Sequence, residues 1–172
     1  MSHGAENICA GCPYNCKYCC AKAWALFYKK IEPRQWLAHK LLRPIHPISD
    51  YRKPPNSTGK TILYPSTHDI TMKHYIYHLI KIRNMIYSGN KVLVISKANS
   101  RVIRNLCDSL LSMKQSVSFM FTIGSVHSKT LKFWEPGAPT FEQRFKALSM
   151  HMKEVIQLQY LAHQCLMHIL LI

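Results

Sequence analysis

The chain has 172 residues and a mass of 20.0 kDa, enough for one domain with a real core and too little for two ordinary domains. Hydrophobic residues make up 48% of the chain and charged residues 18%, so its bulk is expected to be globular rather than disordered. Lys and Arg total 23 against 8 Asp and Glu, a formal net charge of +15, which excludes an acidic protein and makes nucleic acid a candidate partner.

Apolar runs and helical periodicity divide the chain into alternating elements. The first helix is expected over residues 21–36, with a break at Pro33, and an irregular, proline-rich loop follows over 41–60. Short apolar runs then predict strands at 61–64, 91–96 and 117–123. Apolar residues at helical spacing predict helices at 72–87, 102–111 and 141–152, the last with Thr140 as its N-cap.

Strands that are apolar on both faces and separated by helices indicate a parallel α/β sheet with right-handed crossovers. In such a sheet a ligand binds beyond the carboxyl ends of the strands. The segments at these ends, 65–69, 96–97 and 124–125, are polar, as a shared site requires.

Five of the seven cysteines fall between Cys9 and Cys20, whereas a disulfide framework would spread them along the chain. The first six residues are polar and not a signal peptide, and no stretch is long and apolar enough to span a bilayer. We therefore expect a reducing, cytoplasmic compartment, no membrane partner, and metal ligation by the cysteines.

Cys12, Cys16 and Cys19 form a C-x3-C-x2-C motif, which suits an iron–sulfur cluster or zinc. A zinc site normally closes four ligands from two separated pairs. Here only three residues separate the pair Cys9 and Cys12 from the next pair, an awkward reach for one tetrahedron. A cubane cluster held by three thiolates keeps one iron open for a small molecule. Structural zinc stays as the alternative, and Cys9 and Cys20 are expected to be neighbours rather than ligands.

The segment 11–21, GCPYNCKYCCA, resembles the cluster loop of the radical S-adenosylmethionine superfamily, and most closely its branch related to spore photoproduct lyase and the DNA repair photolyase-like proteins. Segments 65–71, 94–97 and 121–125 look like the ends of successive barrel strands in that branch. Residues 132–139, with Glu142 and Arg144, resemble its next signature, so the resemblance covers roughly residues 5–154. Two departures are Cys20, where an aromatic residue is usual, and the absence of a cysteine from 63–67, where the lyase has its hydrogen donor.

The resemblance implies a partial (β/α)6 barrel over residues 1–154 and a radical enzyme, lyase-like or other. It implies that the three motif cysteines hold a [4Fe–4S] cluster and that an external donor of flavodoxin or ferredoxin type reduces it. The cluster would cleave S-adenosylmethionine to a 5′-deoxyadenosyl radical, which abstracts hydrogen from a substrate. The cofactor-binding residues implied are Tyr18 for the adenine; Ser66, Thr67 and Asp69 for the amino group; Ser96 and Lys97 for the carboxylate; and Thr122 and Ser125 for the ribose.

Each of these residues also has a purely structural interpretation. Asp69 is a possible helix N-cap, Lys97 part of a solvated turn, and Tyr18 a packing residue. Phe133 and Trp134 are expected in the core, and a pair of Glu135 with Arg144 is expected at the surface, where it would contribute little. His74 and His78, four residues apart, suggest a metal site but lack a third ligand nearby. The alternative function is a non-catalytic, basic metal-binding module that contacts nucleic acid.

The β/α rhythm stops near residue 154, and residues 155–172 form an atypical tail without the expected glycine turn. The neighbouring reading frame permits a string such as GYSTSISCSPM, which looks like the missing turn and strand. Our hypothesis is a frameshifted end of a longer gene, with the last barrel strands missing and the tail covering the sheet edge as an amphipathic helix. Cofactor binding and turnover would then be weak. The alternative is a genuine short variant with a helical tail.

Overall fold

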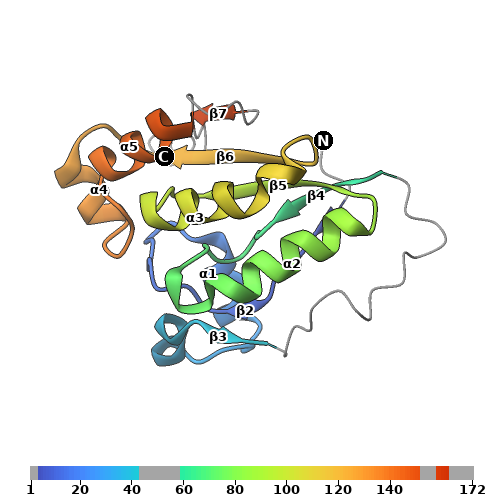
Figure 1. The fold of residues 1–172 in the computed structure, drawn as a ribbon. Coiled ribbons are helices and arrows are strands. Elements are labelled where there is room, and N and C mark those ends of the chain that lie inside the picture. The colour runs from blue at the N-terminus through green and yellow to red at the C-terminus, as the bar shows by residue number, and fades with distance from the viewer. Residues whose placement is uncertain (1–3, 43–58, 152–157, 163–172) are drawn as a thin grey trace.

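The computed structural model describes residues 4–42, 59–151 and 158–162, and its ribbon is drawn in Figure 1. Its main sheet has five strands in the order β1-β4-β5-β6-β7, and every neighbouring pair is parallel. The prediction of an α/β fold in which parallel strands alternate with helices is confirmed. The strands are β1 (Gly4–Ala5), β4 (Thr61–Tyr64), β5 (Lys91–Ser96), β6 (Val117–Ile123) and β7 (Leu158–Ala162).

Four helices connect or follow these strands: α2 (Tyr75–Tyr87), α3 (Ser100–Leu110), α4 (Ser128–Trp134) and α5 (Phe141–His151). The 3-10 turns η3 (Met72–His74) and η4 (Leu111–Met113) extend α2 and α3. Figure 1 shows α2 and α3 side by side on one face of the sheet, where their apolar sides bury strand residues such as Val94 and Phe119. The Thr140 hydroxyl accepts a hydrogen bond from the Gln143 amide at 3.3 Å, as expected of an N-cap.

The segment that contains the cysteines forms a small unit beside the sheet. Strands β2 (Cys9–Ala10) and β3 (Lys40–Leu41) pair antiparallel, and between them lie α1 (Cys20–Phe27) and the 3-10 helix η1 (Pro33–Ala38). The helix predicted for 21–36, with a break at Pro33, is found as two shorter pieces. The first, α1, ends at Phe27, and Pro33 is the first residue of the second, η1. Most of the predicted loop, residues 43–58, lies outside the described residues.

The tail corrects one expectation. Residues 158–162 form β7, which pairs with β6 in the register Phe119↔Leu158 to Ile123↔Ala162, and not the amphipathic helix that the sequence suggested. One further strand is therefore present where the last strands seemed to be missing, because the open edge of β6 offers unpaired backbone donors and acceptors. Residues 155–157 and 163–172 lie outside the described residues, and the frameshift stays a prediction.

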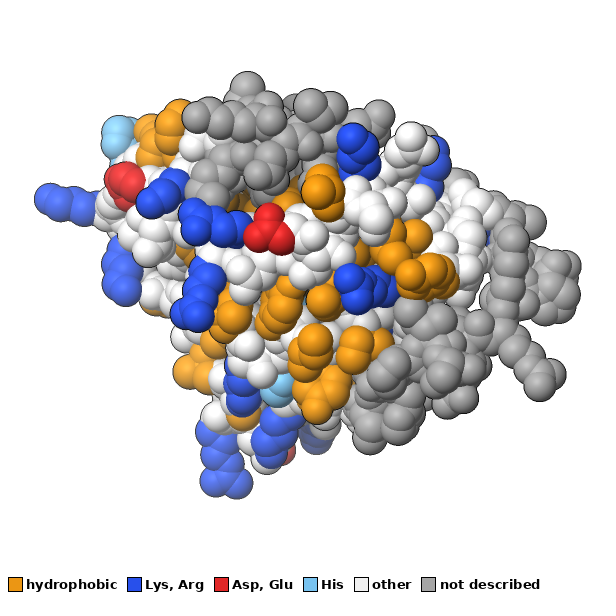
Figure 2. All heavy atoms as spheres, viewed as in Figure 1, with side chains coloured by type: hydrophobic (Ala, Val, Ile, Leu, Met, Phe, Trp, Pro, Cys, Tyr) orange, Lys and Arg blue, Asp and Glu red, His pale blue; other side chains and the backbone are white. Residues whose placement is uncertain are grey.

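Figure 2 shows Lys and Arg side chains across the visible face and few acidic ones, in keeping with the net charge of +15. Among the residues that the structure describes, no helix combines the length and apolar character needed to cross a bilayer.

Candidate metal and cofactor site

The cysteine loop, residues 11–19, is shaped by close backbone contacts. Gly11 has φ +78°, and a Cβ there would lie 2.1 Å from the carbonyl oxygen of the buried Trp36. The Cys12 amide donates to that same oxygen at 2.9 Å. Only glycine fits this crossing, because any side chain would collide with the Trp36 backbone. At the other end of the loop, the Cys19 sulfur accepts a hydrogen bond from the Lys22 amide at 3.4 Å and caps α1.

The three motif cysteines gather in one apolar pocket. Cys12 and Cys16 are buried beside Tyr14 and Trp36, and Cys19 is partly buried against the same group. Burial raises the pKa of Cys12 to about 11 and the pKa of Cys16 to about 12, and neighbouring thiolates add to both shifts. These thiols are therefore protonated at neutral pH unless a cation replaces the proton.

The spacing of the three sulfurs bears on what they can hold. Around one tetrahedral zinc, sulfur atoms lie about 3.8 Å apart, given a Zn–S bond of about 2.3 Å. In the described part of the chain, the three motif cysteines do not form a set whose ligand atoms all lie within 4.8 Å of one another. The loop thus brings three thiols together more loosely than a single tetrahedral ion requires.

A segment after β6 holds the cysteine loop against the sheet. The Lys17 amide donates to the Trp134 carbonyl at 2.8 Å, and the Gly137 amide donates to the Tyr14 carbonyl at 3.0 Å. A Cβ on Gly137 would lie 2.4 Å from the Pro13 carbonyl oxygen. The two segments that carry most of the family resemblance, 11–21 and 132–139, are therefore in direct contact.

Asp69 joins the ends of two strands. It lies in the loop after β4, is buried, and accepts hydrogen bonds from the Ser96 hydroxyl and the Lys97 amide, each at 2.7 Å, just where β5 ends. Burial raises the pKa of its carboxyl group, while these donors favour the charged form. The Asp69 carboxylate also lies close enough to the Cys12 thiol to raise the pKa of that thiol further. Asp69 is not a helix N-cap, because His74 holds that position in α2.

Lys97 stands at the centre of a second network. Its ammonium group lies 3.1 Å from the Tyr18 hydroxyl, 3.1 Å from Glu135 Oε1 and 3.4 Å from the Thr122 hydroxyl. The Tyr18 hydroxyl also donates to Glu135 Oε1. Burial lowers the pKa of Lys97. All three donors of the ammonium group thus have acceptors within the chain, so a bound carboxylate would have to displace one of them.

The pair of Glu135 with Arg144 forms, but the expectation that it lies at the surface is wrong. The exposed fraction of the side chain is 1% for Glu135 and 0% for Arg144. The guanidinium group also donates to the Thr122 carbonyl at 3.0 Å and to the Pro139 carbonyl at 2.9 Å. The core expectation for Phe133 is wrong as well, because its side chain is 56% exposed and lies under the Lys17 ammonium group.

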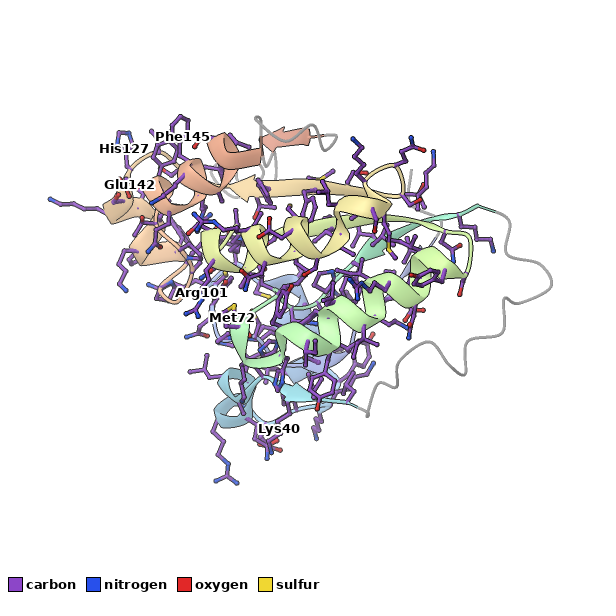
Figure 3. All side chains as sticks on the ribbon, in the orientation of Figure 1. Lys40, Met72, Arg101, His127, Glu142 and Phe145 are labelled. Carbon is purple, nitrogen blue, oxygen red and sulfur yellow. The ribbon has the colours of Figure 1, made fainter. Side chains whose placement is uncertain are left out.

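The structure brings most of the predicted cofactor residues to one edge of the sheet. Tyr18, Asp69, Ser96, Lys97 and Thr122 lie in the two networks around the cysteine loop. The other three are not members of these networks in the hydrogen bonds of the described residues: the amides of Ser66 and Thr67 both donate to Asn7 Oδ1 at 2.9 Å, and the Ser125 hydroxyl accepts from the His127 amide at 3.0 Å. Figure 3 labels one residue from the segment that follows each of the strands β4, β5 and β6: Met72, Arg101 and His127. All three lie on the left side of the view.

One group of ligand-type side chains was missed from the sequence. Cys9, His39, His68 and His78 are all buried, and their ligand atoms lie within 4.8 Å of one another. We call these four residues the Cys-His group. The sequence suggested a pair of His74 with His78, but His74 Nε2 instead bonds to the His39 carbonyl oxygen at 2.7 Å.

Comparison with known proteins adds no relative: no protein family model, no curated protein and no solved structure matches the chain.

Proposed function

We propose that this chain is a radical S-adenosylmethionine enzyme, with the described sheet as part of a (β/α)6 barrel. Cys12, Cys16 and Cys19 would hold a [4Fe–4S] cluster, which an external flavodoxin- or ferredoxin-type protein reduces. When bound, the cluster supplies the electron that cleaves S-adenosylmethionine to a 5′-deoxyadenosyl radical for hydrogen abstraction from a substrate. The observation that carries this proposal is the docking of a three-cysteine loop on the carboxyl edge of a parallel sheet.

The chain's own residues have clear tasks in this proposal. The loop 11–19 positions three thiols beside Asp69 and Lys97, where a cofactor with both an ammonium and a carboxylate group would find opposite charges. Tyr18 presents an aromatic ring beside the Lys97 ammonium group, 5.4 Å from the ring centroid. Its hydroxyl donates to Glu135, which Arg144 holds in turn, so the ring is fixed in place. The burial of Glu135 and Arg144 keeps water from their side of the site.

Anaerobic reconstitution with iron and sulfide tests the proposal. The wild-type chain should bind about four irons and four sulfides and produce 5′-deoxyadenosine when a reductant is added. Cys12→Ala, Cys16→Ala and Cys19→Ala should each lose the iron, whereas Cys9→Ala, Cys20→Ala and Cys107→Ala should retain it. Cys107 is the matched control, because it is a buried cysteine on α3, away from the loop. Iron retained in Cys16→Ala, or lost in Cys9→Ala, would show that the assigned triple is wrong.

A second candidate function, contact with nucleic acid, has its own support in α1. Trp24 and Tyr28 are 58% and 56% exposed and stack on each other with ring centroids 5.4 Å apart. Phe27 is 75% exposed, and the Lys30 ammonium group lies 5.7 Å from the Tyr28 ring centroid. Exposed aromatic rings beside cations are the surface on which single-stranded bases stack. Nucleic acid would then be a substrate of the proposed enzyme or the partner of a non-catalytic module.

Fluorescence anisotropy with a labelled single-stranded oligonucleotide tests this contact. Wild-type affinity should fall as salt rises, because phosphate contacts release counterions. Trp24→Ala should weaken binding by about 1–3 kcal/mol for a lost stacking contact. Leu37→Ala is the control, since Leu37 is 52% exposed but aliphatic and lies on η1. Equal affinity of Trp24→Ala and wild type would rule out α1 as the contact surface.

A further inference from the structure

The Cys-His group comes together from four separate parts of the chain. Cys9 belongs to β2, His39 directly precedes β3, His68 lies in the loop after β4, and His78 is on α2. The exposed fractions are 2%, 1%, 8% and 0%, in the same order. The centroid of the His68 imidazole ring lies 5.5 Å from that of His39 and 5.4 Å from that of His78. Four ligand-type residues therefore converge in a closed interior space.

The hydrogen bonds of the three imidazoles all involve the same ring nitrogen. Nδ1 of His78 lies 2.7 Å from the Tyr64 hydroxyl, Nδ1 of His68 lies 3.2 Å from the Thr67 hydroxyl, and Nδ1 of His39 lies 3.4 Å from the Thr71 hydroxyl. In each ring the opposite nitrogen, Nε2, is buried and has no hydrogen-bond partner in the described part of the chain. Three unpartnered buried nitrogens in one place are unusual, because buried polar atoms in native proteins normally find a partner.

This arrangement matches the two layers of a protein metal site. A metal-bound histidine coordinates through one ring nitrogen and donates its other N–H to an oxygen, which fixes the tautomer and the ring orientation. Here the Tyr64, Thr67 and Thr71 oxygens stand where those N–H groups would donate.

We propose that Cys9, His39, His68 and His78 bind one zinc ion through the Cys9 sulfur and the three Nε2 atoms. Zinc prefers four nitrogen and sulfur ligands in a tetrahedron, and a site closed by four protein ligands is structural. In that geometry the ligand atoms lie about 3.3–3.6 Å apart, given Zn–N bonds of about 2.0–2.1 Å and a Zn–S bond of about 2.3 Å. The observed group, within 4.8 Å throughout, needs only a small contraction. The site is separate from the motif cysteines and does not depend on the proposed radical chemistry.

Metal analysis of the full chain, purified anaerobically from zinc-containing medium, tests this site. The wild type should hold about one zinc ion per chain, whether or not iron is bound. His78→Ala and Cys9→Ala should each reduce the bound zinc at least tenfold, as lost metal ligands do, and leave the iron content unchanged. His74→Ala and Cys107→Ala are matched controls that should keep the zinc, because the Nε2 of His74 bonds to a backbone carbonyl and Cys107 lies on α3. Cys16→Ala should lose iron and keep zinc.

X-ray absorption at the zinc edge of the wild-type chain decides the case even if a variant fails to fold. The expected first shell contains three nitrogens and one sulfur, as the four side chains dictate. A shell dominated by sulfur would place the zinc at the motif cysteines and overturn the proposal. A wild-type chain without zinc after titration with zinc chloride, or a His78→Ala variant that binds zinc as tightly as the wild type, would overturn it as well.

Discussion

The buried guanidinium of Arg144 gives the sharpest stability prediction. The change Arg144→Met removes the charge and keeps most of the apolar length of the side chain. It leaves Glu135, with a side chain only 1% exposed, dependent on Lys97 and Tyr18, and it removes the donors to the Thr122 and Pro139 carbonyls. Removal of one partner from a buried ion pair costs about 3–5 kcal/mol. Here Lys97 still compensates part of the Glu135 charge, but Glu135 Oε2 loses its cation.

In a chain of this size, each kcal/mol lowers the melting temperature by about 2–4 °C, so Arg144→Met should melt roughly 6–20 °C below the wild type. Thermal unfolding followed by circular dichroism measures this shift. Arg101→Met is the matched control, since Arg101 is exposed on α3 and the chemical change is the same. A loss within about 1 kcal/mol of that control would refute the argument, because an exposed charge costs only about 0.5 kcal/mol or less.

The double variant Glu135→Gln with Arg144→Met separates charge pairing from packing. Once Glu135 is neutral, no uncompensated carboxylate remains after Arg144 is replaced, so the double variant should lose less stability than the sum of the two single variants. A coupling of about 1–3 kcal/mol is expected for residues in one buried network. Strict additivity would show that the ion pair itself is not what makes Arg144 important.

Three further changes test neighbouring contacts. Gly137→Ala should destabilise the chain by roughly 1–3 kcal/mol and reduce iron retention, because the new Cβ would collide with the Pro13 carbonyl. Gly124→Ala is the control and should be tolerated, because a Cβ there would lie 3.5 Å from Glu135 Oε1, an ordinary van der Waals contact. Asp69→Asn places an amide N–H against the Lys97 amide. Calorimetry should therefore show weaker S-adenosylmethionine binding, and unfolding experiments should show a loss of about 1–3 kcal/mol in stability. Asp108→Asn, on an exposed face of α3, is the control and should show neither effect. Asn7→Ala leaves the amides of Ser66 and Thr67 without their acceptor and should lower the free energy of unfolding in urea by about 1–2 kcal/mol. Ser66→Ala removes only an exposed hydroxyl and should leave the free energy of unfolding nearly unchanged.

The middle of the fold was predictable because its pattern is local. The bounds of β4, β5 and β6 match the predicted strands residue for residue, and α2, α3 and α5 match within a few residues. Strands β1, β2 and β3 have two residues each, too few to show any alternation, and only their pairing partners define them. Helix α4 has one buried residue, Leu131, so it carries no apolar stripe from which to predict it.

The chemistry of the site was less predictable than its position. Polar residues at the ends of β4, β5 and β6 pointed to the edge of the sheet at which Asp69, Ser96, Lys97 and Thr122 meet, as parallel topology requires. The burial of Arg144 could not be read from the sequence, because it depends on three segments that converge on Glu135. The Cys-His group was missed for the same reason, because its members are far apart in the sequence. Between one member and the next there are 29, 28 and 9 residues, and only His78 belonged to a visible pair with helical spacing. The sequence carried one signal of this group: three histidines lie in or next to elements that pack together in the fold.

The Cys-His group and the candidate cofactor site share two short stretches of backbone. Cys9 and Cys12 are separated by a tight crossing at Gly11, and His68 precedes Asp69 directly. His68 lies next to His39 and His78, whereas the carboxylate of Asp69 accepts from the Ser96 hydroxyl and the Lys97 backbone amide, so the two neighbouring residues contribute to different sites. A zinc ion held by Cys9 and His68 would therefore fix the backbone on which Cys12 and Asp69 are mounted. Such a site would stabilise the fold around the two-residue strands β1 and β2, whereas iron binding depends on the three motif thiols, so loss of the zinc should lower the stability of the chain and leave its iron content unchanged.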